Sequence, residues 1–518
     1  MSSPLLLALV LAAAQPPQLP PALDTYVADV MKAFEVPGLA LAVVKDGKVL
    51  LAKGYGVRKL GDPAPVDART QFGIASNTKI FTATALALLV EEGKLEWDAP
   101  VIRYLPGFAM YDPYVTRELT IRDLLVHRSG LGLGAGDLLW WPPSSYDRKE
   151  VAYRLRFIKP ATSFRTAYAY DNVLYSVAGE VIEAVSGKSW EDFVASRILA
   201  RVGMTASEVR HSAAGGPGNI AGTHARIDGT VRTIAPFLSD NTNPAGGIMS
   251  GAEDMAKWVM VQLDSGRTAD GSRLFSTRTT RELWTIVTPI PIGEPAPELR
   301  ELRSNFNGYG LGLGIRDFRG KKMLSHTGGL PGYLSRVTML PELRLGVVVL
   351  TNQESGNAFN VLTNRILDHF LGATSPDYLG IALRPEAAER TRLASAASRR
   401  AATRDSASGP SLALAKYAGT YRDDWYGDIT IAPEGQGLVI RFSRTPGLVG
   451  DLSHWQHDTF VARWRDRELR ADAFVTFALN PDGSIERARM VPVSDETDFS
   501  FDFQDLELKP VRPPPRPW

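Results

Sequence analysis

Hydrophobic residues recur along the first part of the chain with two periods, one typical of helices and one typical of strands. From Val27 to Phe34 the apolar positions follow helical spacing, and Asp24 stands where it would cap such a helix. The apolar runs 39–44 and 49–57 then flank Asp46-Gly47, a pair typical of a two-residue hairpin turn. The chain is therefore predicted to begin with a helix and a β-hairpin.

The middle of the chain is predicted to be mostly helical, with strands on either side of it. The helical patterns cover Ile80–Glu92, Ile121–Val126, Val173–Ser186 and Asp254–Leu263. Strand patterns return at Tyr309–Ile315, Lys322–Ser325, Tyr333–Leu340 and Leu345–Thr351, and a helix follows at Asn360–Leu371. This order predicts one α/β (α+β) domain at 15–375, with a helical subdomain. Its antiparallel sheet, flanked by helices, would be assembled from the two ends of the domain.

The C-terminal part changes to an all-β pattern. Short runs rich in aromatic and β-branched residues occupy Tyr417–Tyr421, Asp428–Ala432, Leu438–Phe442, Thr459–Trp464 and Phe474–Leu479. Their even spacing predicts a small barrel or sandwich at 412–509. The preceding stretch 376–411, rich in Ala, Arg and Ser, is predicted to be a partly helical linker, and residues 510–518 a disordered tail.

Composition narrows the classes of function. The chain has 58 Lys and Arg against 57 Asp and Glu, a net charge of +1, so it lacks the positive surplus that nucleic-acid binding by bulk charge requires. It contains no cysteine, which excludes disulfides, Cys-based metal sites and a thiol nucleophile. Covalent catalysis would have to use Ser, Thr, Lys or a carboxylate.

The N-terminus carries a short apolar run, Leu5–Ala14, followed by Gln15-Pro16-Pro17. This order is typical of a secretory signal peptide cleaved after Ala14, although residues 1–4 include no Lys or Arg. The run is shorter than the ~20 residues of a membrane span, and no other segment reaches that length. We expect a periplasmic or secreted protein; the alternative is an apolar N-terminus on a cytosolic one.

One segment, Ser76-Asn77-Thr78-Lys79, contains the only Ser-x-x-Lys of the chain. It lies where a loop enters a predicted apolar helix, so backbone N–H groups and the helix dipole would favour negative charge developing at Ser76. Lys79 follows one turn later on the same face, where a partly buried amine helps to activate a serine. Alone, the motif also fits a capped helix with a solvated lysine.

Two further motifs follow in a fixed order. The Tyr-x-Asn motif at Tyr170–Asn172 lies about ninety residues after Ser76, and the His-Thr-Gly-Gly motif at 326–329 about one hundred and fifty residues later. With Ser-x-x-Lys, this set resembles the class C β-lactamase and DD-peptidase superfamily of serine hydrolases. Segments 119–130 and 244–247 are similar too, and the resemblance covers about residues 24–372.

The resemblance implies a catalytic role for each matching residue. Ser76 would be acylated by the substrate carbonyl, while Lys79 and Tyr170 would share the general-base and general-acid work. Lys79 would keep the pKa of Tyr170 low. The backbone N–H groups of Ser76 and Gly329 would form the oxyanion hole, and the glycines after Thr327 would let a carbonyl approach closely. No metal or cofactor is implied.

The substrate-binding residues follow from the same resemblance, with one departure. Asn172 would orient Lys79 and bind the substrate amide, together with His326, Thr327 and Gly328 of the third motif. Penicillin-recognising members usually carry lysine where this chain has His326. Because histidine, with a pKa of ~6.5, is mostly neutral at pH 7, recognition of a substrate carboxylate is weakened there. The His-Thr-Gly form is similar to the esterase and peptidase branches.

Other features of the sequence favour structural interpretations. His127 is interpreted as a hydrogen-bonded structural residue rather than a catalyst. His454 and His457 are interpreted as surface residues rather than metal ligands. The glycine alternation at 308–314 favours close strand packing over a nucleotide loop. For Trp140-Trp141 we favour the wall of a substrate groove over packing, since two adjacent indoles in a loop are hard to bury together.

These observations predict a serine hydrolase that forms an acyl-enzyme on Ser76, with peptides as the favoured substrates (a D-aminopeptidase or DD-peptidase-like activity). An esterase or a weak class C-like β-lactamase is the alternative within this class. A non-catalytic penicillin- or peptide-binding protein is the alternative from another class. The C-terminal β region is similar to the lipocalin-like domain of self-compartmentalising serine peptidases, and a homo-oligomer is left open. The expected partner is a small-molecule or peptide substrate, with no nucleic acid.

Overall fold

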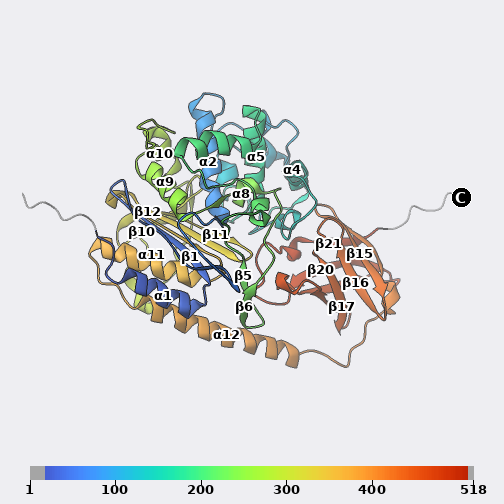
Figure 1. The fold of residues 1–518 in the computed structure, drawn as a ribbon. Helices are drawn as coiled ribbons and strands as arrows, with labels where there is room; N and C mark the ends of the chain where they lie inside the picture. Colours follow the sequence, from blue (N-terminus) through green and yellow to red (C-terminus); the bar gives the residue numbers. More distant parts are fainter. Residues whose placement is uncertain (1–17, 512–518) are drawn as a thin grey trace, which may run out of the picture.

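A nine-stranded antiparallel sheet forms the centre of the larger domain (Figure 1), in a computed structural model that describes residues 18–511. From edge to edge the strands are β3 (Asp62–Pro65), β2 (Lys48–Lys59), β1 (Gly38–Lys45), β13 (Leu345–Thr351), β12 (Tyr333–Leu340), β11 (Lys321–Leu330), β10 (Gly314–Phe318), β9 (Asn307–Tyr309) and β8 (Thr288–Pro289). Because β1 pairs with β13, the expectation of a sheet assembled from both ends of the domain is confirmed.

Helices cover both faces of this sheet. They are α1 (Leu23–Phe34), α2 (Lys79–Glu91), α3 (Pro113–Glu118), α4 (Arg148–Arg154), α5 (Val173–Ser186), α6 (Trp190–Val194), α7 (Ala200–Val202), α8 (Asn243–Gly246), α9 (Ala252–Leu263), α10 (Thr277–Leu283), α11 (Gly356–Leu371) and α12 (Tyr378–Ala402). In Figure 1, α1 and α11 lie below the sheet, whereas α2, α5, α8, α9 and α10 lie above it.

The burial of β1 explains this layered arrangement. Its alternate residues Leu39, Leu41 and Val43 belong to the hydrophobic cluster of α1 and α11. Ala40 and Ala42 point the other way, into the larger cluster under α2 and α9. A strand that is apolar on both faces therefore lies inside the sheet, with a layer of helices on either side.

The C-terminal region is a closed antiparallel barrel, one of the two architectures that its sequence pattern predicts. Its strands follow chain order: β14 (Gly419–Asp423), β15 (Gly427–Glu434), β16 (Gly437–Phe442), β17 (Val449–Gln456), β18 (Thr459–Trp464), β19 (Ala473–Leu479), β20 (Ile485–Pro492) and β21 (Glu507–Pro510). Three of them, β17, β20 and β21, were not predicted. They alternate few apolar residues with many polar ones, and pairing in the closed barrel holds them as strands.

The segment between the two domains is mostly helical, in agreement with the predicted partly helical linker. α12 occupies most of the predicted linker 376–411 and runs from beside α11 towards the barrel (Figure 1). At the other end of the barrel, Pro510 pairs with Tyr421, so the predicted tail begins inside a strand. The predicted signal peptide 1–14 and residues 512–518 of the tail lie outside the described residues. Across 18–511, no helix is long and apolar enough to cross a membrane.

Several local predictions are corrected. Asp24 does not cap α1, which has Ala22 at its N-cap; its carboxylate instead accepts hydrogen bonds from Lys53 and Tyr55. The predicted helix 121–126 is only a 3-10 turn at Asp123–Leu125. The predicted strand 309–315 is broken by a turn between β9 and β10. By contrast, the boundaries of β12, β13 and α5 agree with the sequence pattern.

Candidate active site

The three sequence motifs meet at one cavity of about 430 Å³. Ser76 lies in the 3-10 turn Ala75–Thr78, immediately before α2. Tyr170 lies in the loop before α5, and His326 lies on β11 in the sheet. Side chains that are up to 250 positions apart in the sequence, between Ser76 and His326, therefore border the same space.

The side chain of Lys79 is completely buried behind Ser76. Its Nζ lies 3.0 Å from Ser76 Oγ, 2.8 Å from Asn172 Oδ1 and 3.0 Å from the carbonyl oxygen of Ala245. Burial lowers the pKa of Lys79 to about 7, although Asp137 and Asp171 nearby oppose this shift. A neutral amine has two N–H groups for the two acceptors, which leaves its lone pair for the hydroxyl of Ser76.

The pKa of Tyr170 differs from the one that the sequence analysis predicts. Burial raises the pKa of Tyr170 well above its usual value, and a hydrogen bond with Ser76 only partly offsets this effect. The expectation that Lys79 keeps the pKa of Tyr170 low is therefore wrong, because burial of the phenol, together with Tyr168, Asp137 and Asp171 nearby, raises it. Its Nζ lies 4.9 Å from the centre of the Tyr170 ring. Lys79, rather than a tyrosinate, has the lone pair at neutral pH.

Asn172 is held in a defined orientation between Lys79 and a buried carboxylate. Its Oδ1 accepts from Lys79, while its Nδ2 donates to Asp137 Oδ2 over 2.9 Å. Because the amide nitrogen donates to Asp137, the amide oxygen is the side of Asn172 that faces Lys79. Asp137 is buried and was not singled out from the sequence, where an Asp before Leu138-Leu139 is typical of a helix N-cap.

The third motif is arranged along β11. Thr327 and Gly329 line the cavity, as does His326. Burial lowers the pKa of His326 to about 3, so the ring is neutral, as expected. Its Nε2 lies 2.7 Å from the hydroxyl oxygen of Tyr309, and its Nδ1 bonds the carbonyl oxygen of Thr327. Both ring nitrogens are thus occupied by the protein, which leaves no charged group here for a substrate carboxylate.

Gly328 does not line the cavity. A Cβ at this position would lie 2.1 Å from the carbonyl oxygen of Ile74 and 2.5 Å from Ser335 Oγ. The close approach that a glycine permits here is therefore between β11 and the turn that carries Ser76, rather than between the backbone and a substrate. The backbone of Gly328 is thus in contact with the turn that carries Ser76, and its role in binding substrate stays a prediction.

Aromatic side chains form much of the cavity wall, and one of them comes from the barrel. Trp140 and Trp141 line the cavity, as the groove interpretation predicts, yet both indoles are buried, contrary to the reason given for it. Phe499, in the loop before β21, lies at the rim and remains 41% exposed. Its ring meets that of Tyr170 edge to face, with centroids 6.2 Å apart. No sequence pattern points to Phe499, because aromatic residues also fill barrel cores.

His127 and the glycines at 308–314 agree with structural roles. His127 is fully buried, and its Nδ1 accepts from the backbone N–H of Asp171. A Cβ at Gly312 would lie 2.8 Å from the carbonyl oxygen of Lys79, which explains the glycines at 308–314 by close packing. Within residues 18–511, no group of three or more His, Asp or Glu side chains is placed to hold a metal ion.

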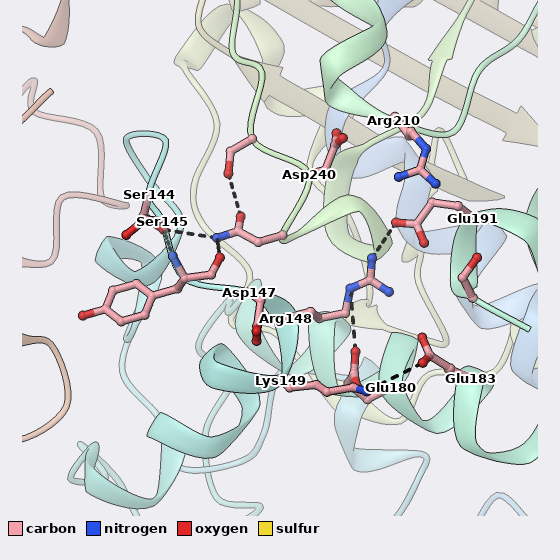
Figure 2. A pocket seen from close by; sticks show the side chains of 14 residues that line it. Ser144, Ser145, Asp147, Arg148, Lys149, Glu180, Glu183, Glu191, Arg210 and Asp240 are labelled. Carbon is pink, nitrogen blue, oxygen red and sulfur yellow. Dashed lines mark hydrogen bonds and ion pairs between the residues drawn. The ribbon is translucent and has the colours of Figure 1, made fainter. Parts of the chain in front are cut away.

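A second, larger cavity of about 770 Å³ lies near α4 and α5 and includes none of the motif residues. Figure 2 shows Arg148 between Glu180 and Glu191, and its guanidinium forms an ion pair with Glu191. The charged groups along this cavity are largely paired with one another. It has no nucleophile activated by a neighbouring base, so the candidate chemistry belongs to the smaller cavity at Ser76.

Comparisons with known proteins agree with this geometry. The family model described as Beta-lactamase matches residues 23–370, and that of a domain of unknown function (DUF3471) matches residues 403–510. The unguisins hydrolase ungD of Aspergillus violaceofuscus is 28% identical, covering 88% of this chain and 85% of that protein. Penicillin-binding protein 4 of Amycolatopsis lactamdurans is 28% identical, covering 66% of this chain and 88% of that protein.

Solved structures show the same fold. The octameric penicillin-binding protein homologue from Pyrococcus abyssi has a TM-score of 0.59 at 22% identity, covering 94% of this chain and 98% of that one. The penicillin binding protein from Bacillus halodurans has a TM-score of 0.53 at 24% identity, covering 65% of this chain and 98% of that one. The first of these likenesses extends over both domains, and the second over a smaller part of this chain.

Proposed function

The chain belongs to the beta-lactamase family of serine hydrolases, and from this premise we propose that it hydrolyses peptides or related amides through an acyl-enzyme on Ser76. The observation that carries the proposal is the environment of Lys79 Nζ, which has two acceptors for its two N–H groups and Ser76 Oγ on its third side. A base of this kind is available at neutral pH without a charged partner.

The proposed reaction has two steps. Ser76 Oγ attacks the substrate carbonyl while its proton passes to Lys79 Nζ, and the leaving amine departs with a proton returned through Lys79 and Tyr170. Water then attacks the acyl-enzyme, its proton passes to the same base, and the acid and free Ser76 are released. The N–H groups of Ser76 and Gly329 are proposed to stabilise the oxyanion in both steps.

Peptides and amides without a carboxylate beside the scissile bond fit the cavity better than penicillins. His326 is neutral, and both its nitrogens are bonded within the protein. The name of the fungal relative, unguisins hydrolase, is a further reason to favour hydrolysis over simple binding. An esterase is the second candidate, since an ester also lacks a carboxylate and has a better leaving group than an amide.

Labelling and a substrate panel test the proposal. Wild-type protein is expected to be labelled by a fluorophosphonate at Ser76, and Ser76→Ala is expected to lose the label and the hydrolysis. A panel of aminoacyl amides of both hands, p-nitrophenyl esters and nitrocefin assigns the substrate class. Absence of any label on the wild type, or full hydrolysis by Ser76→Ala, would favour a non-catalytic binding protein or another nucleophile.

Export to the periplasm or outside the cell remains part of the proposal. It rests on the apolar run 5–14 and the Ala-Ala-Ala that ends it. N-terminal sequencing of the protein from its native host is expected to begin at Gln15, and an intact N-terminus would contradict export by this route.

A further inference from the structure

The loop before β21 of the barrel reaches the hydrogen bonds that hold Lys79. Ser500 is buried, and its Oγ donates to Asp137 Oδ2 over 2.9 Å. The same carboxylate oxygen accepts from Asn172 Nδ2, and Asn172 Oδ1 accepts from Lys79. A continuous chain of hydrogen bonds therefore joins a barrel residue to the base that faces Ser76.

Both carboxylate oxygens of Asp137 accept hydrogen bonds from neighbouring side chains. The indole N–H of Trp140 donates to Oδ1 over 2.8 Å, and Ser500 and Asn172 both donate to Oδ2. Such a carboxylate cannot rotate without breaking two or three hydrogen bonds in a buried site. It thereby holds the amide of Asn172 in the orientation that presents Oδ1 to Lys79.

The barrel also fixes the turn on which Asp137 stands. The carboxylate of Asp502 accepts the backbone N–H groups of Gly136, at 2.6 Å, and Leu138, at 3.1 Å. A Cβ at Gly134 would lie 2.8 Å from the carbonyl oxygen of Phe499, so the two loops are in direct contact. Asp502 is completely buried, so these two hydrogen bonds are shielded from solvent.

We propose that Ser500 is a positioning residue for Lys79, acting through Asp137 and Asn172, so that the barrel completes the active site of the other domain. This inference rests on the proposed function, because it gives a role to the barrel in the same acylation step. It assigns to the barrel a part in the reactivity of Ser76, in addition to the wall that Phe499 forms.

A change in the pH dependence of Ser76 acylation would distinguish a positioning role of Ser500 from a purely stabilising one, because ionisable groups surround the path from Ser500 to Lys79. The groups that interact electrostatically with Lys79 or with Asp137 are Asp171, Asp502, Tyr170, His127, His211 and His326. The ring of Tyr175 also lies 5.0 Å from Lys79 Nζ. Burial raises the pKa of Asp137 to about 7, and the hydrogen bonds from Trp140, Asn172 and Ser500 oppose this rise. Removal of the hydrogen bond from Ser500 would make Asp137 easier to protonate, and the negative charge that raises the pKa of Lys79 would weaken. The acid limb of the acylation profile should then move to lower pH.

The test compares fluorophosphonate labelling of Ser76 in full-length Ser500→Ala, Ser500→Thr and Ser484→Ala across pH 5–9. Ser500→Ala is expected to label about three- to tenfold more slowly at the plateau, the loss of one hydrogen bond on the path, with its acid limb at lower pH. Ser500→Thr keeps the hydroxyl and should restore most of the rate. Ser484→Ala removes an exposed barrel serine bonded within its own turn and should match the wild type.

The outcomes distinguish the two proposals. If the wild type is not labelled at all, the proposed function fails. If the wild type is labelled and Ser500→Ala gives the same rate and the same pH profile, the positioning role is wrong. Should Ser500→Ala unfold, Asp137→Asn supplies the second variant. Asparagine has nearly the same volume as aspartate, but only one acceptor oxygen in place of two. Wild-type labelling by Asp137→Asn would equally overturn the inference.

Discussion

At the scale of single residues, burial decides the protonation states around Ser76. It lowers the pKa of Lys79 to about 7 and of His326 to about 3, and it raises that of Tyr170 well above the usual value. In each case the charged form is disfavoured because water has been removed. The result is a site with a neutral imidazole, a protonated phenol and one amine that titrates near neutrality.

The acylation rate should therefore depend on the protonation of Lys79. Below pH 7 the ammonium has no lone pair for the Ser76 proton, and above pH 7 the amine is free, so the rate should rise with pH and be half-maximal near 7. The pre-steady-state burst of p-nitrophenol from an ester substrate, followed across pH, measures this acylation rate.

Replacing this amine with a permanently charged group should remove the base. Lys79→Arg is expected to reduce the burst rate by about 10²–10⁴-fold, since a guanidinium keeps its proton. Lys48→Arg, at the exposed start of β2, is the matched control and should behave as the wild type. A normal burst in Lys79→Arg would show that another group is the base.

At the scale of elements, β11 and the 3-10 turn before α2 are locked together. Ser335 Oγ donates to the carbonyl oxygen of Ile74 over 2.6 Å and accepts from Asn77 Nδ2 over 2.8 Å. The backbone of Gly328 packs against the same carbonyl. The position of Ser76 is thus set by contacts between the sheet and the turn, in addition to the start of α2.

A side chain at residue 328 should disturb this contact. Gly328→Ala would place Cβ 2.1 Å from the carbonyl oxygen of Ile74, and we expect a loss of about 2–4 kcal/mol in the free energy of unfolding, with slower labelling of Ser76. Gly107→Ala, which has no atom within 4 Å of the added Cβ, should change neither the free energy of unfolding nor the rate of Ser76 labelling. Denaturant unfolding measures the stability, and an unchanged midpoint for Gly328→Ala would contradict the tight contact.

At the scale of the whole molecule, the active-site cavity lies between the two domains. Asp498, Phe499 and Ser500 from the barrel line it together with Ser76 and the residues of the sheet. Their loop borders the space beside Tyr170, where the ring of Phe499 meets that of Tyr170.

Shortening Phe499 should widen the range of acyl groups accepted. In Phe499→Ala the ratio of kcat/KM for a bulky ester to that for an acetyl ester is expected to rise about three- to tenfold, because the rim contact is removed. Tyr114→Ala, at another exposed aromatic residue far along the chain, serves as control. An unchanged ratio would mean that substrates enter from a side that Phe499 does not border.

The sequence by itself determined the catalytic domain and its three motifs, because Ser-x-x-Lys, Tyr-x-Asn and His-Thr-Gly are local patterns and the buried strands β12 and β13 are continuous apolar runs. It also indicated an all-β C-terminal region. Only the tertiary structure decided how the barrel meets the active site, since Asp137 and Ser500 are 363 positions apart and neither lies in a recognisable motif. The pKa values of Lys79 and Tyr170 were likewise out of reach, because burial depends on every element packed around them.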